Sequence, residues 1–316
     1  LKQHPDSDGR GVVIAVLDTG VDPSIPGLTV TPDGGVKVID VQDFSGDGDV
    51  DLTRIYLDNG HLVRQDDDGA PIEFEPPAVA EEGGDRARLW WYGTFREAKF
   101  AASDVSDING NGTTDDEFPI LVTALEGDGD DHAVCYVDTD MDRSFADEKP
   151  LRNYRINFDT FSLHRDTPEA TIDQMAFAVN IFLRAPKVVI YFDNGAHGTH
   201  VAGIAAGYRI NNQEGFNGIA PGAKLMGLKI GAGFVGSIST TEAKKKALQY
   251  AARYAREHHV PVVCNLSYGV ESEIEGNSDI DNVMDDILSK NPYVVFCTSA
   301  GNEGPGLSTV GTPAAA

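Results

Sequence analysis

The residues of this chain that are best suited to catalysis are an aspartate, a histidine and an asparagine that lie far apart in the sequence. Asp18 ends the apolar run V-V-I-A-V-L-D-T-G, His197 begins the small-residue stretch H-G-T-H-V-A-G, and Asn302 lies in S-A-G-N-E-G-P. An imidazole activates a hydroxyl nucleophile when a carboxylate holds its other nitrogen, and an amide N–H stabilises the oxyanion that forms. Together the three residue types indicate nucleophilic catalysis.

These side chains need a framework that brings them to one place. A strand as apolar as residues 12–17 is typical of a parallel sheet covered on both faces, and open α/β sheets hold their sites at the carboxyl ends of the strands. Further along, strands alternate with helices, which predicts a three-layer α/β fold with a mostly parallel sheet. The further predicted strands are 36–41, 187–191, 223–230, 260–267 and 292–298. Three helices are predicted: one begins at His197, and the other two cover 239–258 and 278–290.

A large acidic segment interrupts this fold. Residues 1–44 and 185–316 carry the predicted strands and helices of the core, whereas residues 45–184 form an insertion between Asp18 and His197. Between Phe44 and Ala170 there are 30 acidic and 11 basic residues, and the resulting −19 is most of the formal net charge of −25. Such a charge argues against nucleic-acid or anionic-membrane partners, because like charges repel.

The three segments around Asp18, His197 and Asn302 resemble signature segments of the subtilisin-like serine peptidases, the subtilases. Shorter phrases, among them L-R-N-Y, I-A-P-G-A, L-K-I-G and S-Y-G, resemble more specifically the tripeptidyl-peptidase II group and its bacterial relatives. The resemblance implies that Asp18 orients His197, that His197 acts as base and then as acid, and that Asn302 is the oxyanion donor. The family's serine stands in a G-T-S-M-A-like turn, and residues 1–316 contain no such turn, so we expect this chain alone to be inactive.

The resemblance also indicates where a peptide substrate binds. In subtilases the segment that matches N-L-S-Y-G pairs with the substrate backbone as an added strand, and the segment before the asparagine forms the far wall. The expected substrate-binding residues are therefore Leu266, Ser267, Tyr268, Gly269, Ser299, Ala300 and Gly301.

At two positions the chain departs from the tripeptidyl-peptidase II pattern. That group holds the free N-terminus of its substrate with two glutamates, and the matching positions here are Val270 and Ser239. Glu271 follows Val270 by one residue, and Glu242 follows Ser239 by three residues. Either glutamate replaces a missing one only if the local backbone differs from that of the tripeptidyl-peptidase II group. Because a buried ammonium without a charged partner is strongly disfavoured, we expect endopeptidase or mixed activity, with retained tripeptide release as the alternative.

Within the insertion, two acidic stretches form a possible duplication, D-I-N-G-N-G-T-T-D-D-E and D-T-D-M-D-R-S-F-A-D-E. Alternating oxygen side chains in a short loop are typical of Ca²⁺ sites, but the glutamate of an EF-hand at position 12 is missing. The alternatives are a calcium site in at least one loop and polar turns between strands; no other cofactor is expected. The candidate ligands are Asp107, Asn109, Asn111, Asp138, Asp140 and Asp142.

Composition leaves the broader setting open. No apolar run approaches the ~20 residues of a membrane-spanning helix, so we expect no membrane partner. Cys264 and Cys297 fall in apolar strands, which predicts small buried thiols. Peptides or unfolded proteins are the expected substrates. Any homo-oligomer would use regions outside this chain. The resemblance implies a cytoplasmic protein, with secretion as the alternative. The rival to the peptidase is a catalytically inactive binding or assembly module of the same fold.

Overall fold

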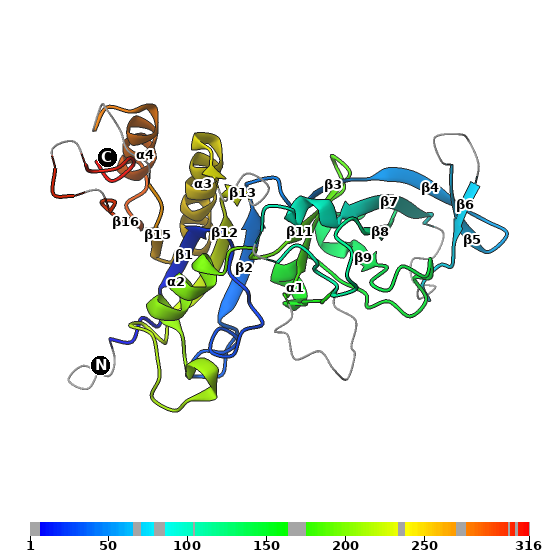
Figure 1. Ribbon diagram of the computed structural model, residues 1–316, viewed down its shortest axis with the longest axis horizontal. Helices are drawn as coiled ribbons and strands as arrows, with labels where there is room; N and C mark the ends of the chain where they lie inside the picture. Colours follow the sequence, from blue (N-terminus) through cyan, green and yellow to red (C-terminus); the bar gives the residue numbers. More distant parts are fainter. Residues whose placement is uncertain are drawn as a thin grey trace. The chain divides into compact units, whose positions relative to one another are not determined.

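The chain divides into two compact units. The computed structural model describes residues 7–65, 71–78, 86–103, 105–163, 175–232, 238–269, 276–302, 304–306 and 309–315. The core unit comprises residues 1–45 and 193–316, and the insertion unit comprises residues 46–192. Figure 1 shows both units, with helices and strands labelled where there is room.

The core unit is built on a five-stranded parallel sheet whose strand order is β16-β15-β1-β12-β2. β1 lies at its centre, and every neighbouring pair runs parallel, so the carboxyl ends of all five strands meet at one edge. The bounds are β1 (Val13–Asp18), β2 (Val38–Asp43), β12 (Lys224–Lys229), β15 (Val262–Leu266) and β16 (Val294–Thr298).

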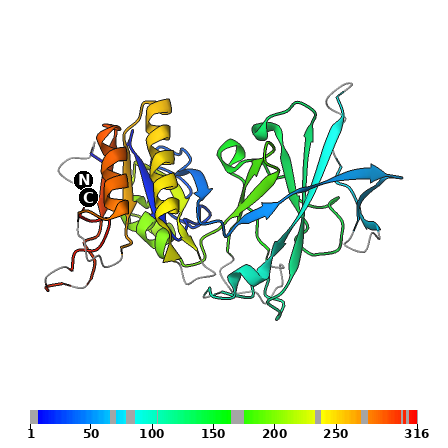
Figure 2. The ribbon, with the colours of Figure 1, turned by 90° about the horizontal axis from the view of Figure 1, so that it is seen from above.

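Helices cover both faces of this sheet. α3 (Thr241–His258) and α4 (Asp279–Ser289) share one hydrophobic cluster with Ala15 and Leu17 of β1, and Figure 2 shows the two helices side by side. Successive side chains of a strand point to opposite faces, so Asp18 projects from the other face, where α2 (His197–Ala206) packs against it. The predicted three-layer α/β fold is confirmed.

Local sequence explains where the core helices begin. The Thr240 hydroxyl accepts a hydrogen bond of 3.0 Å from the backbone N–H of Ala243, which caps α3. Ser278 and Asp281 form a reciprocal capping box at α4. The buried face of α3 consists mainly of alanines, which lets the helix approach the sheet closely. Smaller elements of this unit are η3 (Ile210–Asn212), β13 (Gly231–Ala232) and β14 (Ile238–Ser239).

The insertion unit is mainly antiparallel. Its larger sheet has the order β6-β5-β4-β7-β8-β9, and its smaller sheet has the order β10-β11-β3. Aromatic side chains, including Phe95, Phe100 and Phe177, form much of the core. Its elements are β3 (Asp49–Asp51), β4 (Thr53–Asp58), β5 (His61–Gln65), β6 (Pro71–Phe74), β7 (Arg88–Arg96), η1 (Glu97–Phe100), β8 (Glu117–Leu125), η2 (Asp130–His132), β9 (Val134–Val137), α1 (Tyr154–Asn157), β10 (Ala178–Phe182) and β11 (Lys187–Tyr191).

Two sequence expectations are wrong in detail. β11, expected in the core sheet, pairs antiparallel with β10 and β3 of the insertion unit, because its apolar run suits any sheet buried on both faces. Cys297, expected to be buried, is exposed, since β16 is an edge strand among the described residues. Among the described helices, none is both long and apolar enough to span a membrane.

Candidate active site

Asp18 is the last residue of β1 and stands at the carboxyl edge of the core sheet. The residue is only 5% exposed. Its Oδ1 accepts a hydrogen bond of 2.8 Å from the Thr19 backbone N–H and lies 2.7 Å from His197 Nδ1. Its Oδ2 is buried, with no hydrogen-bond partner in the described part of the chain. Burial raises the pKa of Asp18 above its ordinary value, and the hydrogen bonds from His197 and Thr19 oppose that rise.

His197 is the first residue of α2, and its side chain is 53% exposed. With Nδ1 directed at Asp18, the neutral ring carries its proton on Nδ1 and leaves Nε2 as the basic nitrogen. Nε2 has no hydrogen-bond partner among the residues that the structure describes. The geometry therefore suits an imidazole that is oriented on one side and open to a reacting group on the other.

Gly198 allows α2 to approach the β1 turn closely enough for this contact. A Cβ atom at this position would lie 1.9 Å from the carbonyl oxygen of Gly20 and 2.9 Å from Asp18 Cβ, far inside van der Waals contact. The Gly198 N–H also donates a hydrogen bond of 3.1 Å to the Thr19 hydroxyl. The glycine after the histidine is thus a steric requirement of the Asp18–His197 pair.

A second carboxylate, Asp193, ties the turn after β1 to the start of α2. Its Oδ1 accepts hydrogen bonds from the Thr19 hydroxyl at 2.8 Å and from the Gly195 N–H at 3.2 Å. Its Oδ2 accepts from the backbone N–H of Thr199 at 3.1 Å and from the Thr199 hydroxyl. Sequence reasoning missed this residue, although an aspartate four positions before the histidine was a visible signal.

Lys229 provides another support that sequence reasoning missed. It is the partner of Asp18 in the parallel pairing of β1 and β12, and its side chain is fully buried. Its ammonium donates to the Thr19 carbonyl at 2.9 Å and to Asn194 Oδ1 at 2.7 Å. A lysine directly after the apolar stretch L-M-G-L of the strand was the available signal, because a buried ammonium needs several acceptors.

Asn302 and the expected substrate-binding residues also lie at or beyond carboxyl strand ends. Leu266 ends β15 and is buried, whereas Ser267 and Tyr268 are half-buried and Gly269 is exposed. Ser299, Ala300 and Gly301 follow β16 and lead to Asn302, which is exposed. Among the described contacts, none joins Asn302 to Asp18 or His197, so its role as oxyanion donor stays a prediction.

Of the two glutamates considered as replacements, the structure describes only Glu242. Glu242 is exposed in the first turn of α3 and lies 3.6 Å from Lys245 and 3.7 Å from Lys246, within its own helix. Ser239 is half-buried, and its backbone N–H donates to the Tyr268 hydroxyl at 3.4 Å. Val270 and Glu271 lie outside the described residues.

Comparison with known proteins identifies the family of the chain. The model of the Subtilase family matches residues 9–316, which is nearly the whole chain. The chain belongs to the subtilase family. Subtilases are serine peptidases, and the pairing of Asp18 with His197 places two of the residue types of their mechanism in hydrogen-bond contact.

Individual relatives agree with the subtilase assignment. Pyrolysin of Pyrococcus furiosus is 30% identical and matches 98% of this chain with 24% of its own length. Tripeptidyl-peptidase 2 of Arabidopsis thaliana is 29% identical and matches 99% of the chain with 26% of its own length. A crystal structure of tripeptidyl peptidase 2 covers 99% of the chain with a TM-score of 0.76 at 24% identity, which shows a shared fold. The chain spans about a quarter of the length of these relatives.

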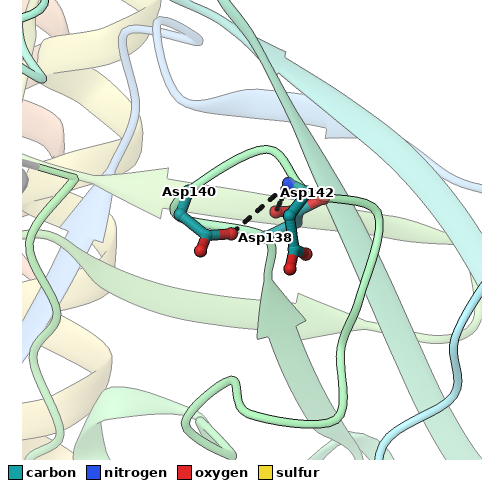
Figure 3. Close-up of side chains that lie close together, drawn as sticks. All are labelled: Asp138, Asp140 and Asp142. Carbon is teal, nitrogen blue, oxygen red and sulfur yellow. Dashed lines mark hydrogen bonds between the residues drawn. The ribbon is translucent and has the colours of Figure 1, made fainter.

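The acidic insertion of this subtilase contains two loops with the same internal hydrogen bonds. In the second loop the Asp142 N–H donates to Asp138 Oδ1 at 3.1 Å and to Asp140 Oδ1 at 3.3 Å, and the Arg143 N–H donates to Asp138 Oδ2 at 2.9 Å. Figure 3 shows the three aspartates of this loop. In the first loop the Asn111 N–H donates to Asp107 Oδ1 and to Asn109 Oδ1, both at 3.1 Å. The Gly112 N–H donates to Asp107 Oδ2 at 2.8 Å. The two stretches therefore form loops with the same local hydrogen bonds.

The second loop groups three carboxylates closely. Oxygen atoms of Asp138, Asp140 and Asp142 lie within 4.8 Å of one another, a spacing that suits a hard cation with oxygen ligands. Burial raises the pKa of Asp138 to about 6 and that of Glu148 to about 7. Polar turns would show the same hydrogen bonds, so the calcium site stays a prediction.

If calcium binds there, it stabilises the insertion unit by mass action. At a hundredfold excess over the dissociation constant we expect about 2.7 kcal/mol of added stability. The measurement compares melting temperatures with calcium and with chelator, for the unaltered chain and for the double variant Asp138→Ala, Asp140→Ala. The exposed Asp58→Ala variant is the control and should keep the calcium response. A melting temperature that calcium leaves unchanged in the unaltered chain would mean polar turns.

Proposed function

We propose that this chain supplies the aspartate and histidine of an Asp-His-Ser peptidase whose serine lies outside residues 1–316. The observation that carries the proposal is the 2.7 Å contact between Asp18 Oδ1 and His197 Nδ1, with Nε2 facing away from the aspartate. Among the described residues, no serine hydroxyl hydrogen-bonds to His197. The chain alone would then hydrolyse no peptide bond, because an oriented imidazole without a nucleophile forms no acyl-enzyme.

In the proposed cycle His197 Nε2 takes the proton of the serine hydroxyl as the oxygen attacks the peptide carbonyl. Asp18 stabilises the imidazolium that forms, and Asn302 donates to the oxyanion of the tetrahedral intermediate. His197 then protonates the leaving amine, and water releases the acyl group by the same steps in reverse order. Peptides or unfolded proteins are the substrates, and any self-assembly uses regions outside residues 1–316.

The mode of cleavage follows from the groups that surround the substrate. We propose endopeptidase or mixed activity, because Ser239 stands where a glutamate would be needed to hold a free N-terminus and Glu242 is engaged with lysines of its own helix. Ser239 offers a substrate ammonium a hydroxyl group and no carboxylate. The preference for a free N-terminus should therefore be lost.

The test is a pair of peptides that differ only at the N-terminus. A longer protein that contains residues 1–316 and the proposed serine is given a peptide with a free N-terminus and its N-acetylated twin. We expect both to be cut at similar rates, and the products are identified by mass spectrometry. Tripeptides released from the free peptide alone would contradict the endopeptidase mode, and no cleavage of either peptide would favour an inactive module.

A further inference from the structure

Lys244 differs from the two lysines that follow it. It lies in the first turns of α3 and is 4% exposed, whereas Lys245 and Lys246 are on the outside of the helix and pair with Glu242. Its neighbours on the buried face are alanines and a leucine, Ala243, Ala247 and Leu248. The sequence K-K-K therefore contains one lysine that the fold takes out of water.

The ammonium of Lys244 has an aromatic contact in place of an ionic one. Its Nζ lies 4.5 Å from the centroid of the Tyr268 ring. No described residue places a carboxylate or carbonyl oxygen within hydrogen-bond distance of this nitrogen. The positive end of the α3 dipole lies nearby and adds to the cost of the charge. Burial lowers the pKa of Lys244 to about 8, so an acceptor at this place would be strongly favoured.

Ser239 supplies a second unsatisfied donor beside the same tyrosine. Its Oγ is buried and has no hydrogen-bond partner in the described part of the chain. Its backbone N–H donates to the Tyr268 hydroxyl at 3.4 Å. A hydroxyl that is buried without an acceptor is disfavoured unless an acceptor arrives from outside, and the Lys244 ammonium contacts the same tyrosine.

These groups lie at the same edge of the core sheet as Asp18. Tyr268 stands two residues after the end of β15, and β15 is the parallel neighbour of β1. β14, with Ser239, leads directly into α3, so Ser239 and Lys244 approach Tyr268 from one connection. A peptide held at this edge for reaction with His197 would pass close to Tyr268.

We propose that Lys244, Ser239 and Tyr268 form a subsite that binds the carboxylate of an acidic residue in the peptide substrate. The ammonium and the hydroxyl donate to the carboxylate oxygens, and the tyrosine ring contacts the methylene groups. The identity of the ligand as a peptide rests on the function proposed above. The subsite disfavours lysine and arginine side chains of the substrate, because their positive charge would be repelled by the Lys244 ammonium.

The test measures binding, so it needs no catalytic serine. N-acetylated, C-terminally amidated fluorescent peptides with one glutamate, scanned through successive positions, are compared with glutamine twins by anisotropy on residues 1–316. At one position we expect the glutamate peptide to bind about tenfold more tightly, because a hydrogen bond between charged groups is stronger than one to an amide. Added sodium acetate at matched ionic strength tests whether any carboxylate competes, and added phosphate tests whether other anions do.

Variants assign the effect to this subsite. Lys244→Met should abolish the preference for glutamate, and Ser239→Ala should reduce it. Lys246→Met, at the exposed lysine of the same helix, should leave it unchanged. Lys244→Glu should reverse the preference toward a lysine peptide, and circular dichroism confirms that each variant is folded. Equal binding of glutamate and glutamine peptides at every position, or a preference that survives Lys244→Met, would overturn the subsite.

The outcome is separable from that of the proposed function. A preference that depends on Lys244 in residues 1–316, together with no cleavage by the longer protein, would keep the subsite and reject the peptidase. Cleavage without any preference for acidic residues would keep the peptidase and reject the subsite.

Discussion

Asp18→Asn in a longer protein that contains the proposed serine is expected to lower kcat on the order of 10⁴-fold. An asparagine keeps the shape of the side chain but does not stabilise an imidazolium, and it favours the wrong tautomer of His197. Because burial disfavours the charged form of Asp18, the neutral asparagine should not lower the free energy of unfolding. A loss of rate without a loss of stability is therefore the expected signature.

The measurement combines steady-state kinetics on a chromogenic peptide with urea unfolding of the same variants. Asp33→Asn is the matched control, since its carboxylate accepts from the Thr31 hydroxyl in a surface turn. That variant should retain full activity. A kcat for Asp18→Asn within tenfold of the unaltered enzyme would contradict the assigned role of the Asp18–His197 pair.

Gly198→Ala should be the most destabilising glycine-to-alanine change among the core-unit glycines whose surroundings the structure describes. The added Cβ would stand 1.9 Å from the Gly20 carbonyl oxygen, and the two backbones would have to separate. Forcing atoms into a filled place costs about 3 kcal/mol or more when backbone must move. The same movement would draw His197 away from Asp18, so activity should fall together with stability.

Gly203→Ala on the same helix provides the comparison. A Cβ at Gly203 meets no heavy atom within 4 Å, so this variant should raise the free energy of unfolding by about 0.5–1 kcal/mol. Both variants are measured by urea unfolding of residues 1–316. Equal unfolding midpoints for the two variants would show that α2 does not approach the β1 turn as described.

The part of the site that could be predicted from sequence is the part with local signals. An apolar strand that ends in aspartate and a small-residue helix that begins with histidine indicate where Asp18 and His197 stand, and their contact confirms that the two segments meet. The alternation of strands and helices after His197 was sufficient for the parallel order of the core. The repeated oxygen positions in the two acidic loops accompany matching hydrogen bonds, and whether either loop binds calcium stays a prediction.

What could not be predicted depends on partners far apart in the sequence. Asp193 and Lys229 support the turn at Thr19 through contacts across 174 and 210 positions, and no local pattern specifies such partners. The run at 187–191 has the composition of a core strand, but pairing with β3 and β10 decides its sheet. Likewise, the burial of Lys244 follows from the face that α3 turns to the sheet, and the three consecutive lysines do not reveal it.

The central claim is that Asp18 and His197 activate a serine in a longer protein, and covalent labelling tests it most directly. A serine-directed fluorophosphonate probe is added to the longer protein, to its His197→Ala variant and to residues 1–316, and labelled peptides are identified by mass spectrometry. We predict one labelled serine outside residues 1–316, strong loss of labelling in His197→Ala, and no labelling of residues 1–316 alone. Labelling that is unaffected by His197→Ala, or no labelled serine in the longer protein, would contradict the account.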